Sequence, residues 1–288
     1  MTSTSATTEL DARLRAAAEA IAHADGLLIC AGAGMGVDSG LPDFRGPAGF
    51  WREYPALADA QLAFEEVASP ATFRRDPTLA WGFYGHRLAL YRRTVPHLGF
   101  SLLRTWGERA RYGAFVFTSN VDGQFQTAGF DPANICECHG SVHYLQCTQP
   151  CGQSVWPADA FIPEVDEAQC RLVNALPRCP TCDALARPNV LMFSDAAWIA
   201  DRTDAQQQRL AQWLAQVERP AVVEIGAGPD IPTVRRFGER SAALRHVPLI
   251  RINPRDAAVG RNGIALPMSA LAALEAIARA MEGITPLP

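Results

Sequence analysis

Five short apolar runs recur along the 288-residue chain, and they constrain its fold more than any other feature. They lie at residues 26–34, 114–121, 189–195, 221–228 and 248–254, and stretches with helical spacing of apolar residues, such as 9–24 and 204–218, separate them. Strands that are apolar on both faces are typical of parallel sheets covered by helices on both sides. The sequence therefore predicts an α/β fold built on a doubly wound parallel sheet.

In such sheets, ligands bind beyond the carboxyl ends of the strands. Here those ends are followed by the loops after Cys30, Phe117, Phe193, Ile225 and Ile252. The first loop begins with Gly32, Ala33 and Gly34, which are small enough for backbone amides to approach a phosphate. A tight turn is the alternative, because Val37 stands where the third glycine of the usual dinucleotide fingerprint belongs.

One segment, from residue 146 to about 186, lacks a long apolar strand but contains five of the eight cysteines, so we expect an inserted module. Cys147 and Cys151 are spaced C-x3-C, and Cys179 and Cys182 are spaced C-x2-C. Four thiolates from two such turns form a closed, structural zinc site. Cys170 lies between the pairs and is an alternative ligand.

Charge and targeting features exclude several classes of function. The formal net charge of −4 gives no general field that would attract nucleic acid or an anionic membrane. The first 25 residues lack the apolar core of a signal peptide, and no apolar run reaches the ~18 residues that span a bilayer. We therefore expect a cytoplasmic protein with reduced cysteines and no contact with nucleic acid or membrane.

Several motifs, taken in order, resemble those of one family. The stretch "GAGMGVDSGLPDFRG", residues 32–46, resembles the sirtuin signature "GAGISxxSGIPDFRG". "TSNVDG" at 118–123, "HG" at 139–140 and "RPNVLMF" at 187–193 resemble later sirtuin motifs, and "GAG" at 226–228 and "RINP" at 251–254 stand where the family has "GTS" and "IN". The chain is thus similar to a divergent, bacterial-type member of the Sir2-like family from about Leu27 to Met268.

The resemblance implies a Rossmann-like fold with a small zinc module. It also implies an NAD-dependent protein lysine deacylase that produces nicotinamide and O-acyl-ADP-ribose from an acylated protein or peptide. His139 is the implied base, because an imidazole takes up a proton near neutral pH. Asn120 would order the ribose and a water, and Asp122 would bind the nicotinamide amide.

The other cofactor contacts that the resemblance implies come from four loops. They involve Gly32, Ala33 and Gly34; Asp43, Phe44 and Arg45; Ser119; and Gly226, Ala227, Gly228 and Asn253. The backbone of the first group would contact phosphate, the second group would close over the cofactor, and Asn253 would reach the adenosine ribose. We expect the cofactor-binding domain to comprise residues 1–145 and 187–288, the zinc module 146–186, and a further helical part to lie near 50–100.

Departures from the family pattern concern the acceptor. Phe193 and Ser194 belong to "FSD", which replaces "FGE" in the segment that pairs with the acyl-lysine peptide. Tyr84 and Arg87 lie on one face of a predicted helix and resemble the Y-x-x-R by which some sirtuins bind the carboxylate of a succinyl or malonyl lysine. The alternative is a packed Tyr84 beside a solvated Arg87.

Two other functions stay open from the sequence. One is a protein mono-ADP-ribosyltransferase or NAD hydrolase on the same fold, which the altered "FSD" and Ser119 positions favour. The other is a non-enzymatic NAD sensor, which would require that His139 not face the cofactor. The sequence does not identify the protein substrate or the oligomeric state.

Overall fold

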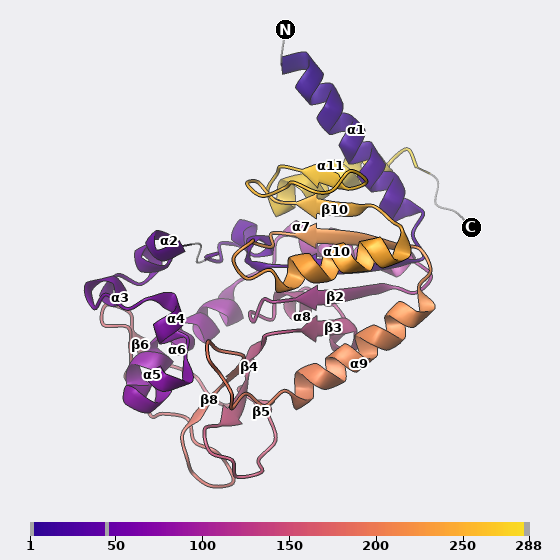
Figure 1. Ribbon diagram of the computed structural model, residues 1–288. Coiled ribbons are helices and arrows are strands. Elements are labelled where there is room, and N and C mark those ends of the chain that lie inside the picture. The colour runs from indigo at the N-terminus through magenta and orange to yellow at the C-terminus, as the bar shows by residue number, and fades with distance from the viewer. Residues whose placement is uncertain (1–2, 44–45, 285–288) are drawn as a thin grey trace.

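The computed structural model describes residues 3–43 and 46–284 and has a six-stranded sheet at its centre (Figure 1). Its strands, in spatial order, are β11 (Ile264–Leu266), β10 (Leu249–Ile252), β9 (Pro220–Ile225), β1 (Gly26–Ala31), β2 (Ala114–Thr118) and β3 (Ile135–Glu137). Every neighbouring pair is parallel. When only these strands are numbered along the chain, the order is 6-5-4-1-2-3, that of a Rossmann-type doubly wound sheet. The predicted fold class is confirmed.

Helices cover both faces of this sheet, which explains why all six residues of β1 are buried. Leu27 and Ile29 of β1 face the helices α1 (Ser3–Ala22), α7 (Leu98–Arg109) and α11 (Ala270–Met281). Leu28 and Cys30 face α9 (Asp201–Gln216) and α10 (Thr233–Arg245). The alternation follows from the two-residue period of a strand, and it divides the apolar core of this domain into two layers.

The run 189–195 was predicted as a strand of the parallel sheet, and this prediction is wrong. The strand there is β8 (Ala186–Val190), and it pairs antiparallel with β4 (Gly140–Cys147) in a separate sheet of order β5-β4-β8. An apolar run indicates burial on both faces, but it does not specify the strand's partner or direction. Residues 191–195 continue as a loop beyond the strand.

Two smaller parts lie beside the main sheet. The helical part consists of α2 (Gly46–Glu53), α3 (Pro55–Asp59), α4 (Phe64–Val67), α5 (Pro70–Arg75) and α6 (Pro77–Arg93). These helices lie to one side of the main sheet in Figure 1, and α6 packs against β4. The cysteine-rich part lies between β4 and β8 in the chain. Its strands have two residues each: β5 (Trp156–Pro157), β6 (Val165–Asp166) and β7 (Arg171–Leu172). The short helix α8 (Gln124–Thr127) and the 3₁₀ turns η1 (Ala33–Met35), η2 (Val37–Ser39) and η3 (Pro132–Asn134) complete the elements.

The helix α6 begins where its sequence predicts a helix start. Asp76 precedes Pro77, and its carboxylate accepts a hydrogen bond from the backbone N–H of Leu79 at 3.1 Å. A capping carboxylate followed by proline at the first helical position satisfies a free donor and costs no hydrogen bond. This start places Tyr84 and Arg87 on the part of α6 that faces the buried interior.

Candidate functional site at the carboxyl edge of the sheet

The loops after β1 and β9 meet at the centre of the sheet, where the strand order reverses. The backbone N–H of Gly34 donates to the carbonyl oxygen of Gly226 at 3.0 Å. A Cβ on Gly34 would lie 2.6 Å from the Cα of Gly226, and a Cβ on Gly32 would lie 2.6 Å from the Cα of Ala227. Only glycine permits this approach, and Gly226 itself has a φ of +64°. Since Ala33 is exposed beside the contact, its backbone is accessible to a ligand.

The loop after β2 is hydrogen-bonded to the loop after β1. The Thr118 hydroxyl donates to the Ala31 carbonyl oxygen at 2.9 Å and accepts from the Asn120 backbone N–H at 3.0 Å. The side-chain amide of Asn120 donates to the Gly32 carbonyl oxygen at 3.0 Å. Asn120 therefore lies against the glycine loop, and its neighbour Ser119 is half-buried on the same segment.

The carboxyl group of Asp122 lies in a buried position after this loop, and the residue is 8% exposed. Burial raises its pKa to about 6, and the negative charge of Glu137 adds to the rise. The backbone N–H of Gln124, which donates to the carboxylate at 2.9 Å, and the charge of Arg87 oppose it. A carboxyl group with a pKa this close to neutrality is typical of functional sites.

His139 follows β3 and is half-buried. Burial lowers the pKa of its imidazole, so the ring is neutral at neutral pH and able to accept a proton. Its carbonyl oxygen accepts a hydrogen bond from the Leu191 backbone N–H at 2.9 Å. This hydrogen bond holds the start of the loop after β8 beside His139, although β8 is not part of the parallel sheet.

Asn253 lies at the end of β10 and is fully buried. Its side-chain amide donates to the Ala227 carbonyl oxygen at 3.0 Å, and its side-chain oxygen accepts from the backbone N–H groups of Arg255 and Asp256 at 3.0 Å each. The side chain thus braces the loops after β9 and β10 against each other. A contact between Asn253 and an adenosine ribose stays a prediction. Space is open beside Gly228, where a Cβ would meet no other part of the described chain within 4 Å, its two chain neighbours aside.

Asp43 lies near the mouth of this edge, and Phe44 and Arg45 lie outside the described residues. The Asp43 carboxylate pairs with the Arg255 guanidinium at 2.8 Å. A cavity of about 360 Å³ adjoins this pair and is also lined by Val37 and Leu41. The ion pair links the loop after β1 to the loop after β10 across the mouth.

Tyr84 and Arg87 are both buried, at 1% and 8% exposure. The Arg87 Nε donates to the Tyr91 hydroxyl at 2.8 Å, and the guanidinium carbon lies 5.2–5.8 Å from the ring centroids of Phe83, Tyr84 and Tyr91. Burial raises the pKa of Tyr84 to about 12, so its hydroxyl stays protonated. Arg87 therefore does not lie in solvent, and its binding of a substrate carboxylate stays a prediction.

Phe193 and Ser194 lie on the loop that follows β8. Phe193 is half-buried, its N–H donates to the Ala68 carbonyl oxygen at 3.0 Å, and its ring packs edge-on against Phe64 with centroids 5.6 Å apart. Ser194 is exposed and has a φ of +54°, a left-handed conformation that a glycine adopts without strain. Ser194 is therefore accessible, and Phe193 joins the loop to the helical part.

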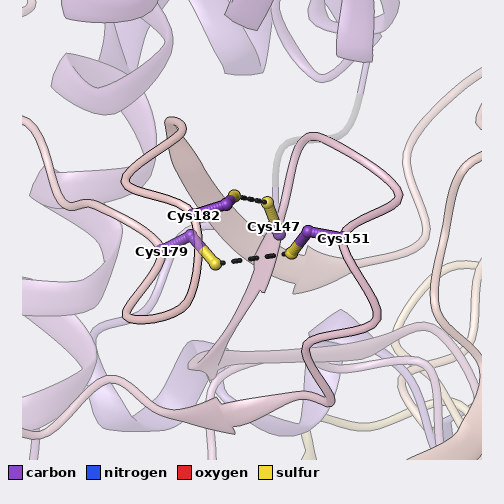
Figure 2. Close-up of side chains that lie close together, drawn as sticks. All are labelled: Cys147, Cys151, Cys179 and Cys182. Atoms are coloured by element: carbon purple, nitrogen blue, oxygen red, sulfur yellow. Dashed lines mark hydrogen bonds between the residues drawn. The ribbon is translucent and has the colours of Figure 1, made fainter.

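The four cysteines of the two predicted turns come together (Figure 2). The Sγ atoms of Cys147 and Cys182 lie 3.6 Å apart, those of Cys151 and Cys179 lie 3.7 Å apart, and all four lie within 4.8 Å of one another. Four thiolates placed tetrahedrally about 2.3 Å from a zinc ion are separated by roughly 3.8 Å. The geometry and the donor atoms therefore fit one zinc ion. Cys170 is not part of the cluster; its carbonyl packs against Gly82 of α6.

Sequence reasoning missed three side chains that hold the loops of this edge. Thr118 joins the first two strands, as described above. Arg235 donates to the Ala227 carbonyl oxygen at 3.0 Å and to the Asp256 carbonyl oxygen at 2.7 Å. The Nε2 atom of His97, the residue before α7, lies 2.9 Å from the Met35 carbonyl oxygen. The backbone groups that these residues bind lie 8 to 87 residues away in the chain, outside any local motif.

The family model of the Sir2 family matches residues 32–215. An NAD-dependent protein deacylase of Pyrococcus furiosus is 36% identical over 168 residues, which cover 57% of this chain and 59% of that protein. The mitochondrial NAD-dependent protein deacylase sirtuin-5 of Danio rerio is 33% identical over 198 residues, covering 63% and 61%. The chain thus spans about three fifths of the length of these curated relatives.

Solved structures agree in fold over nearly the whole chain. The crystal structure of a Sir2 homologue in complex with NAD has a TM-score of 0.71 at 23% identity and covers 93% of this chain and 94% of that one.

Within the described residues, no helix is both long and apolar enough to cross a bilayer.

Proposed function

The chain belongs to the Sir2 family, and we propose that it is an NAD-dependent protein lysine deacylase. The observation that carries the proposal is the assembly at the carboxyl edge: a glycine contact at the strand-order reversal, a buried carboxyl group at Asp122 and a neutral imidazole at His139. The names of the similar proteins, which are NAD-dependent deacylases, support it.

The residues of this edge fit NAD. The exposed backbone around Ala33 and the open space beside Gly228 leave room for a dinucleotide, and the glycines at 32 and 34 allow the loops after β1 and β9 to pack against each other beside it. When bound, NAD would supply a ribose carbon that is open to attack by the substrate's acyl oxygen, because nicotinamide is its leaving group. Asp122 binds the nicotinamide amide, and Asn120 orients the ribose and a water molecule. His139 accepts the proton of a ribose hydroxyl, which is the step that its lowered pKa allows.

We further propose that a zinc ion, held by Cys147, Cys151, Cys179 and Cys182, has a structural role, because four thiolates leave no coordination position open. Thiolates that are free to bind a metal fit a reducing compartment, so we assign the protein to the cytoplasm. The acylated substrate reaches His139 past the loop of Phe193 and Ser194, and its acyl group lies toward Tyr84 and Arg87.

Incubation of the protein with NAD and a panel of acetyl, malonyl and succinyl lysine peptides tests the activity. We expect mass spectrometry to detect deacylated peptide together with an acyl-ADP-ribose. ADP-ribose that forms at the same rate without any peptide would instead indicate an NAD hydrolase. Transfer of ADP-ribose to a protein would indicate a transferase, and NAD binding without turnover would indicate a sensor.

A further inference from the structure

Four buried polar side chains lie within and behind the loop 191–199. They are Gln146 of β4, Arg187 and Asn189 of β8, and Asp195 of the loop itself; we call this set the loop clamp. The side chains of Arg187 and Asp195 are 2% and 0% exposed, and Gln146 and Asn189 are fully buried. A polar cluster of this size inside an apolar part of the molecule is costly unless its groups are paired.

The Asp195 carboxylate joins the two ends of a tight turn in this loop. Its oxygens lie 2.8 and 2.9 Å from Arg187 Nη2 and accept from the backbone N–H groups of Met192 at 3.3 Å and Ala197 at 3.2 Å. Arg187 also donates through Nη1 to the Val190 carbonyl oxygen at 3.3 Å. The ion pair therefore contacts the backbone at the start and at the end of the turn that presents Ser194.

The other two members hold the far end of the same loop. Gln146 donates to the Ala197 carbonyl oxygen at 2.9 Å and accepts from the Ile199 backbone N–H at 3.2 Å. The Asn189 amide donates to the Gln146 side-chain oxygen at 3.0 Å and to the Ile199 carbonyl oxygen at 2.9 Å. The N–H of Leu191, at the start of the loop, donates to the His139 carbonyl oxygen, so the clamp sets the position of Ser194 relative to that histidine.

We propose that Arg187 and Asp195 are positioning residues for the acylated peptide, fixing the loop 191–199 in the conformation that places the peptide's lysine at His139. This inference rests on the proposed deacylase function. A buried ion pair is by itself weak evidence for a purely stabilising role, since replacing one with apolar residues is often neutral or stabilising. A carboxylate is needed because it accepts from Arg187 and from two backbone N–H groups at once. In the Asp195→Asn variant, the side-chain amide would present its own N–H to one of these donors.

Steady-state kinetics of Asp195→Asn test the inference. We expect kcat/KM for the acyl peptide to fall roughly tenfold to a hundredfold, as for a reacting group displaced by about 1 Å. Part of this loss should be a rise in the peptide KM, because the loop that contacts the peptide is no longer held in one conformation. The Kd for ADP-ribose should change by less than about threefold, because among the described residues the clamp forms no hydrogen bond or ion pair with the loops after β1 and β9. Asp195→Glu, which keeps the charge, should restore most of the peptide affinity. Amide hydrogen exchange should become faster in 191–199 of Asp195→Asn.

Glu224→Gln is the matched control, because Glu224 forms an equally buried ion pair with Arg251 between β9 and β10. This variant should lose a similar amount of thermal stability without a rise in the peptide KM. Arg187→Lys gives a second test should Asp195→Asn fail to fold, and it too should raise the peptide KM. If the parent protein is active but Asp195→Asn and Arg187→Lys keep its peptide KM, the positioning role of the loop clamp is wrong and the proposed function stands. A parent protein that does not deacylate any peptide contradicts the proposed function instead.

Discussion

The imidazole of His139 is the group whose protonation should limit the proposed reaction. Burial lowers its pKa from the usual 6.5, so the ring stays neutral down to a pH below that value. A base must be neutral to accept a proton, and therefore kcat/KM should be flat around pH 7–8 and fall only as the pH decreases below about 6.5. A pH profile of peptide deacylation measures this.

Replacing His139 with alanine should abolish deacylation, while the Kd for ADP-ribose stays close to that of the parent protein. The base is lost, but the glycine contact between the loops after β1 and β9 remains. His23→Ala is the matched control, because His23 lies before β1 at the opposite edge of the sheet. Near-normal turnover in His139→Ala would show that another group takes the proton.

Asp122 should lower the stability of the protein at neutral pH. Its pKa rises from 3.8 to about 6 on folding, so the folded state favours the protonated form. Above about pH 6 the folded chain carries a buried charge, whereas below about pH 4 the group is protonated in both states and contributes nothing. Asp122→Asn should therefore raise the free energy of unfolding by up to about 3 kcal/mol at pH 8, and by less as the pH falls toward 4.

Urea unfolding at pH 8 and pH 5 tests this prediction, with the exposed Asp159→Asn as control. The same variant should deacylate poorly, because an amide side chain in place of the carboxylate presents the wrong partner to the nicotinamide amide. A variant as stable as the parent at both pH values would mean that Asp122 is not held in a costly state.

Single residues with unusual chemistry were the easiest to predict from the sequence. Gly32 and Gly34 were predicted to let backbone amides approach a phosphate, and Gly226 was assigned to the cofactor from the family resemblance. The structure brings these three glycines together, and their contact with a phosphate stays a prediction. Asn253 was predicted to reach the adenosine ribose, and this stays a prediction; its role in bracing two loops was not foreseen. Whether an amide faces a ligand or a carbonyl depends on backbone groups from distant segments, and sequence patterns do not contain that information.

Elements were predicted well where they are long and poorly where they are short. The strands β1, β2, β9 and β10 and the helices α1 and α9 agree with the apolar patterns. The three-residue strands β3 and β11 were missed, because an edge strand of that length shows no periodicity. The antiparallel pairing of β8 with β4 is a tertiary choice, made by residues that are far apart in the chain.

The cysteine turns should bind about one zinc ion per chain, and metal analysis of the purified protein measures it. Because the intervening strands have only two residues each, the fold of 146–186 depends on the metal, and a chelator should unfold this segment while the main sheet persists. Cys179→Ser should lose the zinc, and Cys170→Ser should keep it, since Cys170 lies outside the cluster. A metal-free protein with full stability and activity would contradict a structural zinc site.

At the scale of the whole molecule, the candidate site draws on three parts of the chain. The main sheet contributes the loops after β1, β2, β3, β9 and β10, the sheet of β4 and β8 contributes the loop 191–199, and the helical part contributes α6. The aromatic rings of Phe64 and Phe193 join the last two. The acyl group of a substrate would therefore lie between elements that only the folded molecule brings together.

The preference for an acyl group tests this assembly, because Arg87, the residue proposed to bind the acyl group, belongs to α6. A carboxylate paired with a buried guanidinium contributes on the order of 1.5–3 kcal/mol, so a succinyl or malonyl lysine should be preferred over acetyl lysine roughly tenfold to a hundredfold in kcat/KM. Arg87→Met should remove this preference and retain the acetyl activity, since the methionine fills much of the same space against Phe83 and Tyr84. Arg93→Met, an exposed residue of the same helix, should leave the preference unchanged. Equal rates on acetyl and succinyl peptides in the parent protein would instead assign Arg87 to packing within the aromatic cluster, as a partner of the Tyr91 hydroxyl.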